Sequence, residues 1–274
     1  MVWLDDFRDR TVVVTGASSG IGRATAIAFA KAGARVALVA RRRALLEEVA
    51  REAGGDAALP VPIDVTRRSE VRAAFGTIRK HFGQIDIVVN NAGVLIPAKV
   101  AEMRAADLQA MLRVNLFGAL FVLQESLVAM RVQGGGCIVN VASLAGRRGV
   151  SPLGGYCATK FALVGLTEAL REELYDEDIH VALVEPGVVE TPMVERAVED
   201  GLEDLWPERL YMPTSWVVWA VFAAIRFRLR EVSVPPGAGT LEKLAALAPG
   251  AGDELVRWIK WASQWFAGER KEQA

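Results

Sequence analysis

The apolar residues of this chain follow two alternating patterns. Short runs rich in valine and isoleucine predict strands, and longer stretches with apolar residues every three to four positions predict amphipathic helices. The predicted strands lie near residues 11–15, 34–40, 57–63, 85–90, 137–142, 180–185 and 231–235. The predicted helices lie near residues 20–32, 43–53, 67–82, 102–131, 154–176 and 214–229.

This alternation of strand and helix predicts the fold class. Strands that alternate with helices pair in parallel through right-handed crossovers, with helices on both faces of the sheet. Near-continuous apolar strands, such as residues 85–89, fit a sheet that is covered on both faces. We therefore expect an α/β protein with a doubly wound, mostly parallel, seven-stranded sheet of the Rossmann type. Ligands of such sheets bind beyond the carboxyl ends of the strands.

A glycine-rich segment joins the first predicted strand to the first predicted helix. It reads Thr-Gly-Ala-Ser-Ser-Gly-Ile-Gly from Thr15 to Gly22. A strand, a tight loop and a helix N-terminus aim free backbone N–H groups at a phosphate. The alternative is a structural turn without a ligand. The positions expected to bind a dinucleotide are Gly16, Ser18, Ser19, Gly20, Ile21 and Gly22.

A tyrosine and a lysine stand four residues apart, at Tyr156 and Lys160. In a helix these residues share one face. A neighbouring ammonium favours the phenolate, so we expect the tyrosine pKa to fall below its ordinary value of about 10. Such a tyrosine could exchange a proton with a substrate oxygen. Since the same spacing also occurs on solvated helix faces, the pair needs support from other motifs.

Together, the glycine pattern and the Tyr156/Lys160 pair resemble the short-chain dehydrogenase/reductase family. The resemblance covers roughly residues 8 to 192, and its motifs occur in family order. It implies four catalytic residues, which are Asn115, Ser143, Tyr156 and Lys160. It also implies cofactor contacts in the segment Asn90-Asn-Ala-Gly93, at the catalytic pair and in the segment Pro186-Gly-Val-Val-Glu-Thr191. Those contacts are assigned to Asn91, Ala92, Gly93, Tyr156, Lys160, Pro186, Gly187, Val189 and Thr191.

The resemblance implies hydride transfer between a nicotinamide and a carbonyl or alcohol carbon. Tyr156 would be the general acid in reduction and the base in oxidation, while Lys160 would also hold the nicotinamide ribose. Ser143 would hydrogen-bond the substrate oxygen, and Asn115 would support a water relay. The alternatives are an ordinary strand-end serine and a helix-interior amide.

The end of the second predicted strand bears on cofactor choice. Enzymes of this fold that use NAD usually place a carboxylate there, but this chain has Ala40 followed by Arg41 and Arg42. Guanidinium groups suit a 2′-phosphate, so we expect NADP(H) rather than NAD(H), with Arg41 as the stronger candidate. A solvated basic helix start is the alternative. Asp64 and Val65 resemble the family's adenine-contacting pair, although Asp64 could equally cap a helix.

Composition narrows the class of protein. The 274 residues suit one domain spanning residues 1–274, and a net charge of -1 gives no sign of nucleic-acid binding. Neither the two cysteines nor the two histidines form a metal-ligand pattern, so we expect no metal and a reducing compartment.

The start of the chain lacks a secretory signal, and no run reaches the roughly 18 apolar residues of a membrane span. We expect a cytoplasmic protein and, from the resemblance, a homodimer or homotetramer.

The family motifs thin out after Thr191. Within the divergent region 193–274, residues 193–212 mix large apolar residues with acids, as in a substrate lid or in ordinary surface packing. Residues 253–266 predict an amphipathic helix rich in tryptophan. We expect this helix to pack on the protein or on a partner subunit. Contact with a membrane surface and a place at the substrate mouth are the alternatives.

The combined expectation is an NADP(H)-dependent oxidoreductase acting on a hydrophobic ketone, aldehyde or secondary alcohol. One alternative is an NAD-preferring alcohol dehydrogenase. The other is a nucleotide-binding regulatory protein without turnover, but all four catalytic positions are occupied by the family's residues, which favours an enzyme.

Overall fold

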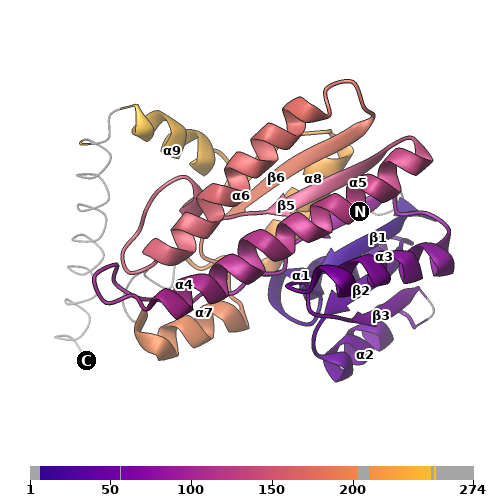
Figure 1. The fold of residues 1–274 in the computed structure, drawn as a ribbon, viewed down its shortest axis with the longest axis horizontal. Helices are drawn as coiled ribbons and strands as arrows, with labels where there is room; N and C mark the ends of the chain where they lie inside the picture. The colour runs from indigo at the N-terminus through magenta and orange to yellow at the C-terminus, as the bar shows by residue number, and fades with distance from the viewer. Residues whose placement is uncertain (1–6, 56, 203–209, 248–249, 251–274) are drawn as a thin grey trace.

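A parallel sheet forms the centre of the molecule, as the sequence predicts (Figure 1). The computed structural model describes residues 7–55, 57–202, 210–247 and 250. Within them, seven strands pair in the order β3-β2-β1-β4-β5-β6-β7, and every neighbouring pair is parallel. The strands are β1 (Thr11–Thr15), β2 (Arg35–Ala40), β3 (Ala58–Pro62), β4 (Ile87–Asn90), β5 (Gly136–Val141), β6 (Ile179–Pro186) and β7 (Glu231–Val234).

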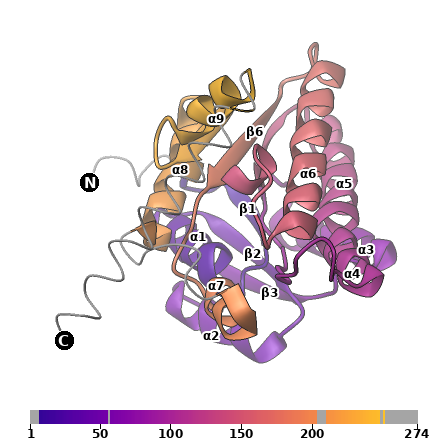
Figure 2. The same ribbon diagram turned by 90° about the vertical axis from the view of Figure 1, so that its left-hand side faces the viewer.

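Helices cover both faces of this sheet (Figure 2). One face packs against α1 (Gly20–Lys31), α2 (Arg43–Glu52) and α8 (Thr214–Arg226). The other packs against α3 (Arg68–Phe82), α5 (Ala119–Gln133) and α6 (Gly154–Glu173). The described chain also contains α4 (Ala105–Leu112), η2 (Arg113–Gly118), η3 (Leu144–Gly146), α7 (Pro192–Ala197), η4 (Val198–Leu202) and α9 (Ala238–Ala246).

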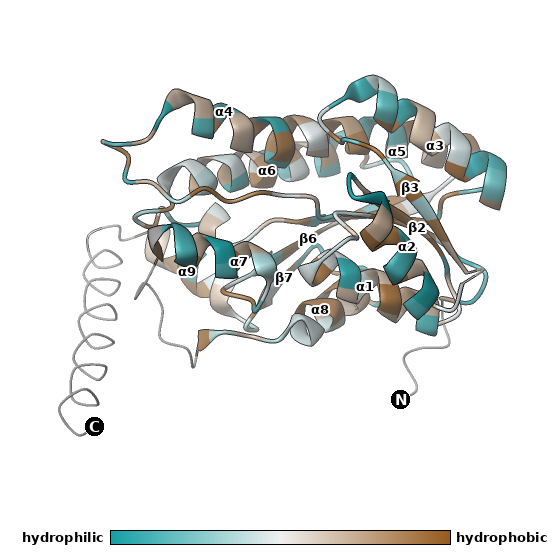
Figure 3. Cartoon of the chain, turned by 90° about the horizontal axis from the view of Figure 1, so that it is seen from below, coloured by the Kyte–Doolittle hydropathy of each residue, from teal (hydrophilic) through white to brown (hydrophobic). Residues whose placement is uncertain are grey.

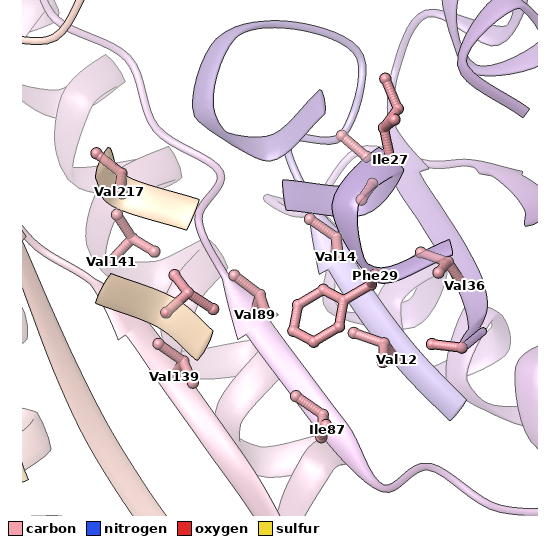
Figure 4. Close-up of a cluster of buried hydrophobic side chains, with 14 of the residues drawn as sticks. Val12, Val14, Ile27, Phe29, Val36, Ile87, Val89, Val139, Val141 and Val217 are labelled. Atoms are coloured by element: carbon pink, nitrogen blue, oxygen red, sulfur yellow. The ribbon is translucent and has the colours of Figure 1, made fainter. Parts of the chain in front are cut away.

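The period of two along β1 explains how one sheet supports two cores. Val12 and Val14 pack beside Phe29 in one core (Figure 4), whereas Val13 belongs to the core on the opposite face. Burying a side chain of this size stabilises the fold by about 1.5–3 kcal/mol. In Figure 3 the strands are mainly hydrophobic, while the covering helices alternate hydrophobic and hydrophilic residues.

The continuous helix predicted over residues 102–131 is interrupted. Its axis passes through α4, a π-helical turn at η2 and then α5. Asn115 lies in the π-helical turn and is 1% exposed. A wider turn of this kind often marks a functional position in a helix. Apolar periodicity gives no sign of it, because the residues on both sides keep the same buried face.

The stretch from Ala105 to Gln133 is the one described helix that is long and apolar enough to cross a membrane, judged only by length and composition. It packs within the domain, because α5 contacts α3, β4 and β5, and α4 contacts α6. A helix in the core of a globular domain meets the same two criteria.

The region after Thr191 contains helices that the sequence analysis did not predict. Where a lid was expected, α7 begins with Pro192 at its first turn and continues into η4. The last described helix, α9, follows β7 directly. Each is too short to show a clear helical period. The predicted amphipathic helix over 253–266 lies outside the described residues, as do residues 203–209 of the expected lid.

Candidate active site

The motifs from distant parts of the sequence meet at one edge of the sheet. Thr15, Asn90 and Pro186 end β1, β4 and β6, and Ser143 comes two residues after β5. Because all these strands are parallel, their carboxyl ends lie at the same edge. This edge is where doubly wound sheets bind their ligands.

The glycine loop has the close packing that a pyrophosphate cradle requires. A Cβ added to Gly22 would lie 2.4 Å from the carbonyl oxygen of Gly16, and one added to Gly16 would lie 2.8 Å from Nδ2 of Asn91. Gly16 also has a φ of +70°, in the region that favours glycine. At Ser19, the N-cap of α1, no side-chain hydrogen bond caps the helix, and its first turn contains no acidic residue. The free N–H groups of this turn suit an anion.

Thr15 fixes the neighbouring loop against this cradle. Its Oγ1 accepts hydrogen bonds from the backbone N–H groups of Asn91 at 2.9 Å and Ala92 at 3.0 Å. Nδ2 of Asn91 donates to the carbonyl oxygen of Thr15 at 2.9 Å. Sequence reasoning did not assign Thr15 a role, although a polar residue ending an apolar strand was a possible signal.

The segment that follows β6 lies against the glycine loop. A Cβ added to Gly20 would lie 3.1 Å from Cγ2 of Thr191, which is itself buried. Val189 is also buried and pairs with Met212 in an isolated bridge. The backbone of Gly187 donates to the carbonyl oxygen of Val234 at 2.7 Å. The segment from Pro186 to Thr191 is therefore fixed at both ends, beside the loop that suits a phosphate.

Tyr156 and Lys160 lie on α6, where the helical spacing places them together. Nζ of Lys160 is 5.6 Å from the centre of the Tyr156 ring and donates to the carbonyl oxygen of Val141 at 3.0 Å. The lysine is 4% exposed. A Cβ added to Gly93 would lie 3.9 Å from Nζ of Lys160, so the loop after β4 closes over this ammonium.

The pKa of Tyr156 differs from the sequence expectation. Burial raises it above the ordinary tyrosine value, although a hydrogen bond with Ser143 acts in the opposite direction. Burial also lowers the pKa of Lys160 to about 8. The expected lowering of the tyrosine pKa is therefore wrong, because burial outweighs the hydrogen bond that lowers it. Burial disfavours the charged form of both side chains, the phenolate of Tyr156 and the ammonium of Lys160.

Ser143 lies between the strand edge and the tyrosine. Its Oγ accepts from the backbone N–H of Ala145 at 3.1 Å, which caps η3, and donates to the carbonyl oxygen of Pro186 at 3.2 Å. The same hydroxyl also interacts with Tyr156. Ser143 thus joins the turn after β5, the loop after β6 and the proposed acid.

The side chain of Asn115 holds the loop after β4 against α6. Its Oδ1 accepts from the backbone N–H of Val94 at 2.8 Å. Its Nδ2 donates to the carbonyl oxygen of Val94 at 2.9 Å and to Oγ1 of Thr159 at 3.0 Å. Thr159 precedes Lys160, so this amide also fixes the helix turn that carries Tyr156 and Lys160. Nothing in the sequence singled out Thr159.

The two arginines after β2 take different positions. Nη2 of Arg42 donates to Oγ of Ser18 at 3.0 Å and to Oγ of Ser19 at 3.2 Å, so this guanidinium borders the glycine loop. Arg41 is exposed and lies near Asp64. Burial alone would raise the pKa of Asp64, but hydrogen bonds from Thr66 and the charge of Arg41 lower it.

The predicted adenine pair follows β3. Oδ1 of Asp64 accepts from the backbone N–H of Thr66 at 2.9 Å in a local turn, while α3 begins at Arg68. Asp64 therefore closes a turn and is not the N-cap of α3. Val65 is buried and packs against Gly118 of η2, where an added Cβ would lie 2.9 Å from the valine.

An apolar cluster surrounds Tyr156. Leu153, Cys157, Ala197 and Leu202 form its buried part, and its members come from α6, α7 and η4 as well as the loops before α6 and after β4. Its partly buried members are Leu95, Ala145, Val150 and Tyr156. The described surroundings of the phenol on this side are therefore apolar side chains and the thiol of Cys157.

A separate cavity of about 670 Å³ lies at the opposite edge of the sheet, among the amino ends of the strands. Its charged groups are paired, because Nη1 of Arg10 contacts Asp86 at 2.9 Å and Nη2 of Arg228 contacts Asp178 at 3.0 Å. None of the sequence motifs borders it, so the candidate site is the motif-bearing edge.

The fold and the site define a dinucleotide-binding α/β protein with a Ser–Tyr–Lys cluster beside the binding loop. Comparisons with known proteins agree with this class. Residues 10–201 match the family model described as short chain dehydrogenase. An uncharacterized oxidoreductase of Staphylococcus haemolyticus is 34% identical over 233 residues, which are 85% of this chain and 100% of that protein.

Solved structures give the same assignment. A short-chain dehydrogenase/reductase from Mycobacterium marinum is 32% identical with a TM-score of 0.79, covering 85% of this chain and 96% of that one. A short chain dehydrogenase/reductase from Burkholderia phymatum in complex with NAD is 26% identical with a TM-score of 0.80, covering 90% of this chain and 96% of that one. The chain belongs to the short-chain dehydrogenase family.

Proposed function

We propose that this oxidoreductase uses NADP(H) to interconvert a carbonyl group and a secondary or primary alcohol on a hydrophobic small molecule. The observation that carries the proposal is the contact of Ser143, Tyr156 and Lys160 at the sheet edge that also bears the glycine loop. The cradle at Gly16, the uncapped start of α1 and the nearby arginine fit a dinucleotide. When bound, such a cofactor supplies the hydride.

Each side chain has a role that its surroundings support. Tyr156, protonated at neutral pH, donates its proton to the substrate oxygen in reduction and removes one in oxidation. Ser143 stabilises charge on the same oxygen through its hydroxyl. Lys160 provides an ammonium beside the phenol and the ribose-binding region, and Asn115 supports the helix turn that bears Lys160 and, from the family resemblance, a water relay.

The preference for NADP(H) is supported by charge at the end of β2. Ala40 stands where a carboxylate would accept from the ribose 2′-hydroxyl, and Arg41 and Arg42 follow it. Arg42 already lies against Ser18 and Ser19. The relative from Burkholderia phymatum was solved with NAD, which makes an NAD-preferring enzyme the second candidate.

The apolar surroundings of Tyr156 support a hydrophobic substrate. A cytoplasmic location is supported by Cys137 and Cys157, which are both free, buried thiols. A homodimer or homotetramer is supported by apolar side chains exposed on η2, α5 and α6, which are Phe117, Val128, Val132 and Phe161.

The catalytic proposal is tested by following NADPH oxidation by absorbance against a panel of apolar ketones and aldehydes. The wild type is expected to turn over at least one of them, and Tyr156→Phe to lower kcat by about 10²–10⁴-fold. NADPH affinity, measured by fluorescence, should change little in this variant. Equal turnover by wild type and variant would remove Tyr156 as the acid.

The cofactor proposal is tested by measuring NADPH and NADH affinity for Arg41→Ala, Arg42→Ala and Arg43→Ala. Loss of a charge-assisted hydrogen bond to the 2′-phosphate should weaken NADPH binding by about tenfold or more in the first two variants and leave NADH binding nearly unchanged. Arg43, the first residue of α2, is the matched control and faces Glu47 at 3.8 Å. Equal losses for both cofactors would contradict the 2′-phosphate assignment.

A further inference from the structure

A group of buried and half-buried ionic side chains lies directly behind the candidate site. Arg147 follows η3, the turn that Ser143 caps, and its side chain is 11% exposed. Its Nε donates to Oε1 of Glu185 at 2.5 Å. Glu185 is 1% exposed and immediately precedes Pro186 in β6. The sequence analysis gave neither residue a role.

The Arg147–Glu185 pair forms a second bridge between the turn after β5 and the end of β6, which Ser143 already joins. Oγ of Ser143 donates to the carbonyl oxygen of Pro186. Arg147, four residues after Ser143, donates a hydrogen bond to Glu185, the residue before Pro186. The turn after β5 and the end of β6 are therefore linked by one hydrogen bond at the reaction edge and by one ion pair beside it.

The remaining nitrogens of Arg147 reach two further elements. Nη1 lies 3.1 Å from Glu168 of α6, and Nη2 lies 3.3 Å from Glu231 of β7. A planar guanidinium with fixed donor directions sets the mutual positions of the elements that it contacts. α6 also carries Tyr156, so Arg147 connects the serine turn to the helix that bears the proposed acid.

Close packing keeps this arrangement rigid. A Cβ added to Gly146 would lie 3.0 Å from the carbonyl oxygen of Lys160, so the serine turn rests on the backbone of the catalytic helix. A Cβ added to Gly239 of α9 would lie 2.9 Å from Oε2 of Glu185. The carboxylate is thus enclosed from the side opposite Arg147.

The charges of the group balance. Arg147, Arg171 and Lys243 provide three positive charges, and Glu168, Glu185 and Glu231 provide three negative charges. Arg171 lies 3.3 Å from Glu231, and Lys243 also pairs with Glu231. Burial raises the pKa of Glu185, while Arg147 acts against this rise. A buried ion pair contributes little net stability compared with apolar side chains of similar volume. The location of the Arg147–Glu185 pair therefore suggests that it positions the segments that it joins.

We propose that Arg147 and Glu185 form a positioning pair that holds Ser143 and the Pro186 loop in register with Tyr156 for proton transfer. This inference rests on the proposed oxidoreductase function. Neither residue touches the reacting atoms. Small displacements of a reacting group lower rates steeply, by about 10²-fold for a shift of about 1 Å.

The test uses Arg147→Met/Glu185→Leu, which removes both charges together and leaves neither one buried alone. This double variant is expected to fold with a Tm close to wild type, to bind NADPH with similar affinity and to lose about 10–100-fold in kcat. The matched control is Arg131→Met/Glu177→Leu. It removes a bidentate pair, with Nη2–Oε1 at 2.7 Å, near the amino ends of the strands. The control should keep wild-type kcat.

Two readouts separate positioning from a general structural effect. In a Ser143→Ala background, removing the pair should lower kcat by less than about twofold, because groups that act as a unit are not additive. Restoring a hydrogen bond with Arg147→Lys/Glu185→Gln should recover part of kcat. Wild-type kcat in the Arg147→Met/Glu185→Leu variant would overturn the proposal, as would a full additional loss in the Ser143→Ala background.

Hydrogen exchange provides a readout that does not depend on turnover. The backbone amides of Gly146, which donates to Ser143, and Gly187, which donates to Val234, should exchange faster in Arg147→Met/Glu185→Leu than in wild type or the control. Unchanged exchange at both loops would overturn the positioning role. A wild-type protein that turns over no carbonyl compound would count against the proposed function instead, and the exchange result would still decide the positioning role.

Discussion

The buried position of Lys160 favours the neutral form of its side chain over the charged form. Its ammonium is almost fully buried, donates to the carbonyl oxygen of Val141, and has its pKa lowered to about 8. Tyr156, one helical turn away, has its pKa raised by the same burial. The buried ammonium of Lys160 is therefore an unfavourable burial of charge within the site. Functional sites commonly reduce stability in this way.

Replacing Lys160 with Met should stabilise the cofactor-free protein at pH 7 by about 1–3 kcal/mol while abolishing turnover. The variant gains stability because it no longer buries a charge. The loss of the hydrogen bond to the carbonyl oxygen of Val141 reduces this gain. Since the folded pKa of about 8 lies below the unfolded value of 10.5, the unfolded chain binds more protons between these pH values. Wild-type stability should therefore rise relative to the variant from pH 8 to about 10.5.

Urea unfolding at pH 7 and pH 10, at one protein concentration, measures this difference. Lys31→Met, at an exposed position in α1, is the control and should not gain stability at pH 7. A Lys160→Met variant that is less stable than wild type at pH 7 would contradict the cost assigned to the buried ammonium.

At the scale of the residue, the sequence predicted which groups meet but not how they are held. Ser143, Tyr156 and Lys160 follow from motif spacing, and the structure brings them together. The threonine hydroxyl of Thr15 bonds to a loop 76 residues away, and Arg147 pairs with Glu185 38 residues away. Such contacts depend on strand order and loop shape, which local patterns do not encode.

Among the elements, the strands were easiest to predict because a sheet buried on both faces requires apolar runs. β1 and β2, for example, begin and end within one residue of the expected positions. The π-helical turn at η2 and the short helices α7 and α9 were missed. Helical periodicity needs several turns to be visible, and a π-turn between two helices leaves that period nearly unchanged.

The junction between the glycine loop and α1 depends strongly on one residue, Gly22. In Gly22→Ala the new Cβ would lie 2.4 Å from the carbonyl oxygen of Gly16, so the backbone must move. We expect a loss of about 1–3 kcal/mol of stability and about tenfold or more in NADPH affinity. Chemical unfolding and fluorescence titration measure the two effects.

Gly76→Ala provides the matched control, because no atom lies within 4 Å of the added Cβ in this helical position of α3. This substitution should be neutral or stabilise the protein by up to about 1 kcal/mol. If Gly22→Ala behaved like Gly76→Ala in both measurements, the close packing at the loop would have no functional consequence.

At the level of the whole molecule, α5 and α6 of one helical layer expose large apolar side chains. Val128 of α5 is 56% exposed, and Phe161 of α6 is 45% exposed. Exposed apolar patches often mark a protein interface, and we expect these side chains to form one. The same helices cover one face of the sheet and carry the catalytic pair, so association there would also restrain α6.

If this surface is the interface of the proposed homodimer or homotetramer, a Val128→Lys/Phe161→Lys variant should shift the protein toward smaller species. Charged residues at the centre of an apolar interface are strongly unfavourable. Light scattering after size-exclusion chromatography measures the mass. Ala44→Lys, at an exposed position of α2 on the other side of the sheet, should leave it unchanged. An unchanged mass in the double variant would remove this surface as the interface.

The most direct measurement of the central claim is deuterium transfer from NADPH that carries deuterium at both C4 positions of its nicotinamide, using the best carbonyl substrate found. The wild type should place deuterium on the new alcohol carbon, while Tyr156→Phe, with NADPH still bound, should form this product about 10²–10⁴-fold more slowly. Label-free product would contradict hydride transfer from the bound dinucleotide, and labelled product formed equally fast by both proteins would contradict proton donation by Tyr156.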